Sequence, residues 1–306
     1  MIGHLRVKSP LSQLGIFLGL FGGAFIMASL IVVAVATVKG VPVASIQNLD
    51  PARPGSLTTM KWIQSISSLV IFLLPALFFA IIVFNGRPLY FLGIRKPARI
   101  NMYALAVVIV VAAFPFVLWL GEINQRIPLP EWMTAMDKDA SKHMEAFLKT
   151  ENASDVAINI LVIALLPAIC EELCFRGALQ RVLINIVKNP WAGITLTAIL
   201  FSALHLQFQG FLPRMFLGMA LGALYWYSGS LWTSILAHFV VNATQIIAVS
   251  YAPKYINENP SVPVYLTIGS AVVVLALMAI YRRESPITYS KWYKTEELNM
   301  YNQFIS

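Results

Sequence analysis

Long runs of hydrophobic residues dominate the chain, and short polar loops separate them. A bilayer core requires about 20 consecutive, mostly apolar residues from each helix that spans it. The pattern therefore predicts an all-α polytopic membrane protein with about eight transmembrane helices. The expected spans cover approximately residues 11–38, 62–85, 102–121, 155–187, 191–208, 212–228, 230–250 and 262–281.

One segment, residues 129–150, is too polar to span a bilayer, yet its apolar residues recur at helical spacing. Such a stripe is typical of an amphipathic helix that lies in the membrane interface. A helix packed on the ends of the outer loops would carry the same stripe, so the pattern leaves both interpretations open. The stripe consists of Trp132, Met133, Met136, Ala140, Met144, Phe147 and Leu148.

The spans and loops divide the chain into four consecutive parts. They are N-terminal transmembrane helices (1–121), an amphipathic segment (122–153), a helical core (154–251) and a last transmembrane helix with a basic aromatic tail (252–306). The first run is too long for the core of a signal peptide, so we expect a retained transmembrane helix. An interfacial anchor is expected in the tail, which contains Tyr289, Lys291, Trp292, Tyr293 and Lys294.

Composition agrees with a membrane protein and gives an orientation. The chain is 58% hydrophobic and 12% charged, which is about half the charged fraction of a soluble domain. Its net charge of +8 comes from basic residues in short loops, so it indicates orientation by the positive-inside rule and not nucleic-acid binding. We expect both termini on the cytoplasmic side of the plasma (inner) membrane. The basic residues that carry this argument include Arg87, Arg95, Lys96, Arg99, Arg282 and Arg283.

A few ionisable residues interrupt the apolar runs of the core. Glu171, Glu172 and Arg176 lie near the middle of the fourth run, His205 ends the fifth, and His238 lies within the seventh. Each ionised group at a helix centre costs roughly 2.5–3.5 kcal/mol on insertion scales. These side chains are therefore expected to face the bundle interior or a water-filled cavity. The two cysteines, Cys170 and Cys174, lack zinc-site spacing and are interpreted as small apolar residues.

The two glutamates are expected to play different roles. Glu172 and Arg176 are four residues apart with the acid first, which is the favourable order for an ion pair. Glu171 points about 100° away around the helix and has no assigned local partner. Pro167, four residues earlier, should kink or open the helix beside it.

Spacing around the Asn189-Pro190 turn brings a histidine into the same site. Glu171 lies 18 residues before Asn189 and His205 lies 16 after it. In an antiparallel hairpin both residues would stand about 24–27 Å from the turn. His205 is therefore expected beside Glu171.

Two pairs with a spacing of four support a polar site shared by three helices. Phe201 and His205 share one face of the fifth run, and His238 and Asn242 share one face of the seventh. A histidine alone on a helix is usually a core residue. Together with Glu171, however, these residues indicate a functional site.

The three motifs Glu171-Glu172-x3-Arg176, Phe201-x3-His205 and His238-x3-Asn242 resemble the CAAX protease and bacteriocin-processing family, also called the Abi family. The resemblance covers roughly residues 155–250 and marks 154–251 as a catalytic core. It implies an intramembrane glutamic endopeptidase in which Glu171, with His205, activates water, while His238 and Asn242 stabilise the oxyanion. Glu172, Arg176 and Phe201 would support this site. The expected partners are the bilayer and a membrane-associated peptide or lipidated protein.

The implied chemistry suits these residue types, although other interpretations stay open. A carboxylate in an apolar site can act as a general base, and amide and imidazole N–H groups can stabilise an oxyanion. No cofactor is expected. Zinc held by Glu171, His205 and His238 is a weaker alternative. A non-catalytic membrane scaffold or immunity factor and a proton-coupled transporter also remain alternatives, because intramembrane carboxylates and histidines serve in transporters too.

Overall fold

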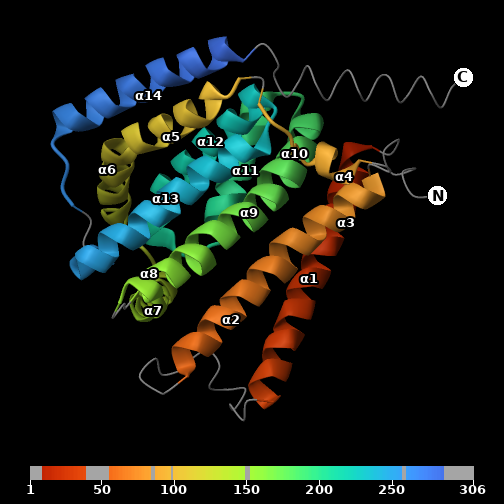
Figure 1. The fold of residues 1–306 in the computed structure, drawn as a ribbon, viewed down its shortest axis with the longest axis vertical. Helices are drawn as coiled ribbons and strands as arrows, with labels where there is room; N and C mark the ends of the chain where they lie inside the picture. Colours follow the sequence, from red (N-terminus) through yellow and green to blue (C-terminus); the bar gives the residue numbers. More distant parts are fainter. Residues whose placement is uncertain are drawn as a thin grey trace, which may run out of the picture.

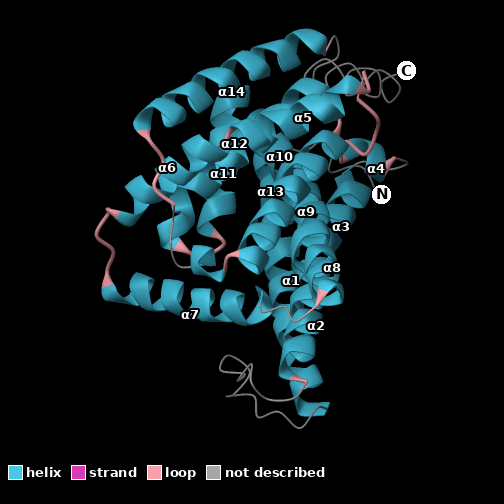
Figure 2. Cartoon of the chain, turned by 60° about the vertical axis from the view of Figure 1, so that its left-hand side comes forward, coloured by secondary structure: helices cyan, strands magenta, loops and turns pink. Residues whose placement is uncertain are grey.

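A computed structural model describes residues 9–38, 55–83, 87–97, 99–148, 152–256 and 260–285. Every regular element in these ranges is a helix, as Figure 2 shows, and the predicted all-α polytopic fold is confirmed. Within the described ranges six helices, not eight, are long and apolar enough to cross a membrane. These are Pro10–Val38, Leu57–Val83, Asn101–Gln125, Ala153–Val187, Leu231–Tyr251 and Val264–Glu284.

The N-terminal part contributes two long rods that splay away from the other helices (Figure 1). The first is α1 (Pro10–Val38), and the second is a continuous run of α2 (Ser56–Ser68), the π-helix η3 (Leu69–Leu73) and α3 (Leu74–Val83). The short α4 (Pro88–Phe91) follows. Phe17 on α1 and Phe79 on α3 pack edge to face with ring centroids 5.6 Å apart, which joins the two rods near their upper ends.

The third predicted span is interrupted at Ala113. Helix α5 (Asn101–Ala112) and α6 (Phe114–Gln125) meet there because Pro115 cannot donate a backbone hydrogen bond. Ser270 of α14 (Val264–Glu284) fills the break. Its hydroxyl donates to the carbonyl of Ala112 at 2.6 Å and accepts from the N–H of Phe116 at 3.4 Å.

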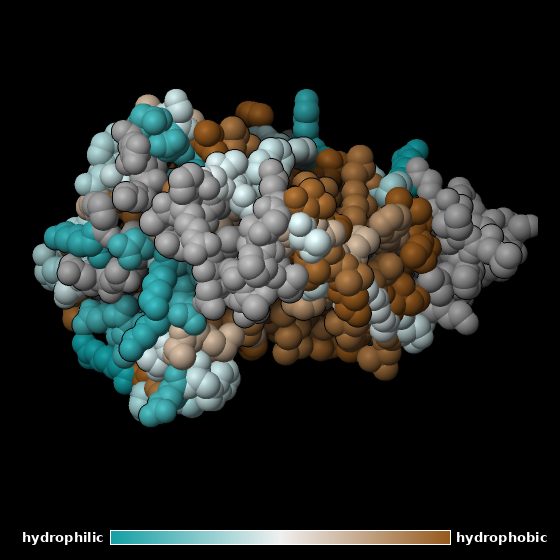
Figure 3. All heavy atoms as spheres, turned by 90° about the horizontal axis from the view of Figure 1, so that it is seen from below, coloured by the Kyte–Doolittle hydropathy of each residue, from teal (hydrophilic) through white to brown (hydrophobic). Residues whose placement is uncertain are grey.

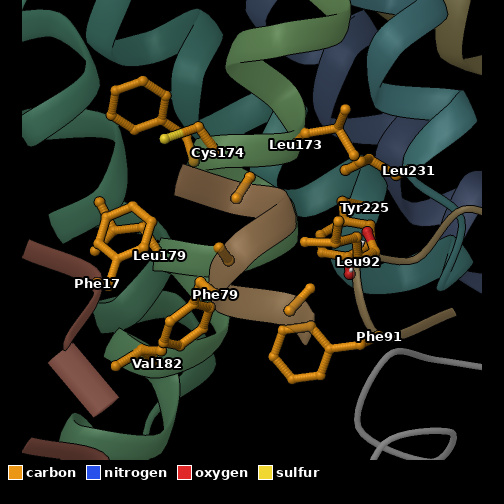
Figure 4. Close-up of a cluster of buried hydrophobic side chains, with 14 of the residues drawn as sticks. Phe17, Phe79, Phe91, Leu92, Leu173, Cys174, Leu179, Val182, Tyr225 and Leu231 are labelled. Carbon is orange, nitrogen blue, oxygen red and sulfur yellow. Dashed lines mark hydrogen bonds between the residues drawn. The ribbon is translucent and has the colours of Figure 1, made fainter. Parts of the chain in front are cut away.

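The central rod carries the acidic motif. It comprises α8 (Ala153–Asn159), η4 (Ile160–Leu165), α9 (Leu166–Glu172), η5 (Leu173–Leu179) and α10 (Gln180–Val187). The π-helix η4 ends just before Pro167, which agrees with the predicted opening of the helix at this proline. The C-terminal half of the rod, η5 and α10, is packed in the main hydrophobic core. Figure 4 shows this core, in which Phe17, Phe79 and Phe91 from the N-terminal helices join Leu173, Leu179 and Val182 of the rod.

The rod continues into a hairpin that is shorter than the sequence predicts. Helix α11 (Pro190–Ala203) has 14 residues and is therefore about 21 Å long, less than the ~30 Å of a bilayer core. The chain turns at Leu206, whose φ is 52°, forms the 3-10 turn η6 (Phe208–Gly210) and returns as α12 (Phe211–Ser228). The expected helix over 191–208 is thus wrong at its C-terminal end, and His205 lies in a turn.

The amphipathic segment forms α7 (Glu131–Leu148), close to the predicted 129–150. Figure 2 shows that α7 lies across the lower end of the bundle. Leu148 and Met144 pack against Ile246 and Val249 of α13 (Leu231–Tyr251), and α7 also contacts η6 and η7 (Pro253–Ile256). The packing on neighbouring turns, one of the two interpretations of the stripe, is therefore observed. Its position in a membrane interface stays a prediction.

Large apolar side chains cover much of the outer surface. Leu30 of α1 and Leu275 of α14 are 65% and 72% exposed, which a water-facing surface would not favour. Viewed from below, hydrophobic side chains form a broad band over one part of the molecule and hydrophilic ones gather at the other (Figure 3). The tail residues predicted as an anchor, 289–294, lie outside the described residues.

Candidate active site

Glu172 and Arg176 form the predicted ion pair inside the bundle. Their Oε1 and Nη1 atoms are 2.7 Å apart, and both side chains are fully buried. Arg176 also donates from Nη2 to the carbonyl of Gly218 on α12 at 3.3 Å, and its guanidinium stacks on the Phe201 ring at 4.4 Å. A buried charge needs such partners, because its removal from water costs on the order of several kcal/mol per ion.

Glu172 has two further partners, both from α13. Nδ1 of His238 donates to Oε1 of Glu172 at 2.8 Å, and the hydroxyl of Ser234 donates to Oε2. Ser234 lies one turn before His238 on the same helix face. Glu172 therefore ties α13 to the central rod and fixes the orientation of the His238 ring, a role that the sequence analysis did not assign to it.

Glu171 is placed differently from its neighbour. Its side chain is 11% exposed, and its Oε2 atom lies 3.9 Å from Nε2 of His238. Since Nδ1 of His238 carries the proton donated to Glu172, neutral His238 would present a bare Nε2 to this carboxylate. Two acceptors do not face each other favourably unless a proton or a water lies between them. The Glu171–His238 gap is therefore suited to proton exchange.

His205 is connected to the site through Phe201. Nδ1 of His205 donates to the carbonyl of Phe201 at 2.7 Å, which leaves Nε2 of the neutral ring as an acceptor. The Phe201 ring contacts the His205 ring at 4.8 Å and the His238 ring at 5.8 Å, both edge to face. Among the described residues no hydrogen bond or ion pair joins His205 to Glu171, so their joint action on a water stays a prediction.

Asn242 lies one turn after His238 on α13 and is half-buried. The structure thus brings Glu171, Glu172, Arg176, Phe201 and His238 into one connected cluster, with His205 beside it. In the described part of the chain, no three His, Cys, Asp or Glu side chains come together as a metal-binding group. Zinc dependence is an alternative that a chelator can test directly.

Arg214 is a cation near the site that the sequence analysis missed. It lies on α12, interacts electrostatically with Glu171, and donates from Nη1 to the carbonyls of Ser202 and Gln207. The signal was present in the sequence, because Arg214 is the only Lys or Arg between Pro190 and Ala252. Ser234 could have been found as well, since it precedes His238 by four residues.

This polytopic helical protein carries paired carboxylates, histidines and an amide on facing helices. Together they form a membrane-embedded polar site of the kind that supports hydrolysis. Residues 153–244 match the family model described as Rce1-like, type II CAAX prenyl endopeptidase Rce1-like. This segment contains all three motifs, so the resemblance is confirmed there and the chain carries a core of the CAAX protease type of intramembrane endopeptidase. No curated protein and no solved structure matches the chain.

Proposed function

We propose that this protein is a glutamic intramembrane endopeptidase in which Glu171 is the general base. The observation that carries the proposal is the difference between the adjacent glutamates. Glu172 is bound by Arg176, His238 and Ser234, whereas among the described residues Glu171 has no hydrogen bond, one ion-pair contact at 3.9 Å to His238 and a side chain that is 11% exposed. A carboxylate free of a strong partner can accept a proton from water.

The proposed reaction begins with a water held between Glu171 and the bare Nε2 of His205. Glu171 takes one proton as the water oxygen attacks the scissile carbonyl. The proton then passes to the leaving nitrogen as the C–N bond breaks, which yields a carboxylic acid and an amine, and the acid then loses its proton to water. Positioned acid–base groups of this type typically contribute about 10²–10⁴-fold to rate.

His238 and Asn242 are proposed to stabilise the oxyanion. A protonated His238 would donate from Nδ1 to Glu172 and from Nε2 towards the reacting carbonyl oxygen. The positive ring would be balanced by the two glutamates. The Asn242 amide, one turn further along α13, would supply a second donor, and loss of one such donor typically costs about 10²–10³ in rate.

The proposed substrate is a peptide or lipidated protein associated with the same membrane. We also propose that both termini are cytoplasmic. Support comes from the charges at the two ends of the bundle. The end formed by residues 87–101 and the C-terminus of α14 is rich in Arg and Lys, and its hydrogen bonds join Arg95 to Gly229 and Arg99 to Glu284.

The test compares membranes from cells that contain the wild-type protein or the Glu171→Gln variant by mass spectrometry of protein termini. We expect precursors to accumulate and their cleaved termini to disappear in the variant. Glu145→Gln makes the same chemical change at an exposed position of α7 and serves as the matched control. Cleavage by Glu171→Gln at the wild-type level would refute the assigned base.

A further inference from the structure

His205 lies on an irregular turn, Leu204–Gly210, which we name the His205 loop. The loop follows a helix only about 21 Å long, which is too short to cross the ~30 Å of a bilayer core. Irregular backbone inside a membrane is tolerated only where the protein or a water-filled cavity satisfies its polar groups. The partners of this loop therefore determine where His205 is held.

Asn124, at the end of α6, holds both sides of the turn. Its Nδ2 donates to the carbonyl of Phe208 at 2.8 Å, and its Oδ1 accepts from the N–H of Leu212 at 2.6 Å. The Asn124 residue is 3% exposed. A single buried amide thus satisfies one carbonyl at the start of η6 and one N–H just after it, and a hydrophobic side chain in its place could satisfy neither.

Helix α7 supplies a second contact to the same turn. Oδ2 of Asp137 accepts from the N–H of Gln209 at 3.2 Å, and the Asp137 residue is 7% exposed although it lies on a mostly polar helix. The Trp132 ring packs edge to face on Phe208, with centroids 5.5 Å apart. The amphipathic helix is therefore joined directly to the loop that carries His205.

Further polar groups of the hairpin are bound from α11 and α12. The hydroxyl of Ser202 donates to the carbonyl of Phe211 at 2.8 Å. Arg214 donates to the Gln207 carbonyl at 3.3 Å and to its side-chain oxygen at 2.8 Å. These contacts are within the hairpin itself, whereas Asn124 and Asp137 reach the loop from helices outside it.

We propose that Asn124 and Asp137 are positioning residues for His205, and that α6 and α7 together clamp the His205 loop. The proposal rests on the proposed function, because it assigns these residues an effect on peptide hydrolysis through His205. Neither residue belongs to the three motifs. Their loss changes turnover by letting His205 move away from the reacting water.

The first test replaces Asn124 with leucine, whose side chain has the same branched arrangement of heavy atoms and no hydrogen-bonding group. Asn159→Leu is the matched control, because Asn159 is also buried and donates to a backbone carbonyl, that of Phe147, away from the His205 loop. Hydrogen exchange of peptides covering residues 204–212 is measured by mass spectrometry on the full-length protein in nanodiscs. We expect faster exchange there in Asn124→Leu than in wild type or Asn159→Leu.

The second readout is the rate at which cells cleave the precursors that accumulate with Glu171→Gln. Asn124→Leu should lower this rate about 10²-fold, the effect of a displacement of about 1 Å in a catalytic group. Asp137→Leu should act in the same direction. Asp137→Asn, which keeps an acceptor oxygen for Gln209, should restore most of the activity, and Asp139→Asn, on the exposed side of α7, should have no effect.

The outcomes separate the two proposals. Unchanged exchange at residues 204–212 in Asn124→Leu, or an equal loss of cleavage in Asn159→Leu, would overturn the clamp. A wild-type protein that cleaves no precursor would instead contradict the proposed function. In that case, faster exchange in Asn124→Leu would still show that Asn124 holds the His205 loop in place.

Discussion

Glu171 and Glu172 are adjacent in sequence, but the two carboxylates differ in how many partners stabilise their negative charge. Glu172 accepts from an arginine, a histidine and a serine in a fully buried position. Glu171 keeps a small exposed fraction and, among the described residues, one ion-pair contact, at 3.9 Å. Breaking a buried ion pair by removing one partner is strongly destabilising, whereas a carboxylate with few partners contributes little to folding. The two residues should therefore separate stability from catalysis.

Glu172→Gln should lower the thermal stability of the purified protein markedly. The substitution leaves the Arg176 charge buried without its carboxylate, and such losses typically cost about 3–5 kcal/mol. Glu171→Gln should leave the melting temperature close to that of wild type. Tryptophan fluorescence in detergent, followed during heating, measures both.

Glu122→Gln is the control for the loss of an ordinary ion pair. Glu122 binds Arg126 at 2.5 Å, but both side chains are partly exposed, and pairs of this kind contribute about 0–1 kcal/mol. If Glu171→Gln and Glu172→Gln lowered the melting temperature equally, the division of roles between the two glutamates would be wrong.

The residue-scale predictions from sequence succeeded where the interaction is local. The Glu172–Arg176 pair follows from their spacing on one helix, and the structure contains it. The contact of His238 with Glu172 could not be derived in the same way, because it depends on the rotation of α13 against the central rod. Sequence spacing indicated that His238 belongs to the site, but it did not identify which glutamate holds it.

At the scale of elements, the turn between α10 and α11 joins two helices that approach each other closely. Asn189 caps α11 by accepting from the N–H of Ala192 at 3.1 Å, and Lys188 before it has a φ of 55°. A Cβ on Gly193 would lie 2.4 Å from Cγ1 of Ile184 and 2.8 Å from its backbone. The hairpin that places Phe201 and His205 against the central rod therefore requires a glycine here.

Gly193→Ala should destabilise the protein by about 1–3 kcal/mol, the usual cost of overpacking. Gly19→Ala on α1 is the matched control, since a Cβ there meets no atom within 4 Å. Thermal unfolding and cleavage of accumulated precursors should both be impaired in the first variant only. Equal stability of the two variants would mean that α10 and α11 are not packed this closely.

Hydropathy predicted that the helices exist better than it predicted where they end. The first, fourth, sixth, seventh and eighth runs correspond to helices within about three residues at each end. Leu204 and Leu206 extend the fifth apolar run beyond the point where α11 stops. The helix ends because Ser202, Arg214 and Asn124 satisfy the backbone of a turn. Hydrogen bonds of this kind leave no trace in local hydrophobicity, and the one from Asn124 comes from a helix more than 80 residues earlier in the chain.

At the scale of the whole molecule, the two ends of the bundle differ in charge. One end contains Arg87, Arg95, Lys96 and Arg99, with Arg282 and Arg283 at the end of α14. The other end contains α7 with its neighbouring turns, where acidic and basic residues are mixed. Because cytoplasmic loops are enriched in Lys and Arg, the basic end should be cytoplasmic and α7 should lie on the opposite side.

Cysteine accessibility tests this orientation. Both native cysteines are buried, and replacing Cys170 and Cys174 with alanine gives a background for single exposed cysteines. Lys142→Cys on α7 and Lys96→Cys at the basic end are suitable, because both lysines are exposed. In intact cells a membrane-impermeant maleimide should label Lys142→Cys, and Lys96→Cys only after the cells are permeabilised.

The orientation has a consequence for the substrate. The His205 loop contacts α7 through Asp137 and Trp132, so this part of the site lies nearer the α7 end of the bundle. If α7 is outside, a substrate that approaches from this end presents its scissile bond from the non-cytoplasmic side, as an exported peptide would. Labelling of Lys96→Cys in intact cells, with Lys142→Cys protected, would reverse the orientation and place the same end of the site towards cytosolic lipidated proteins.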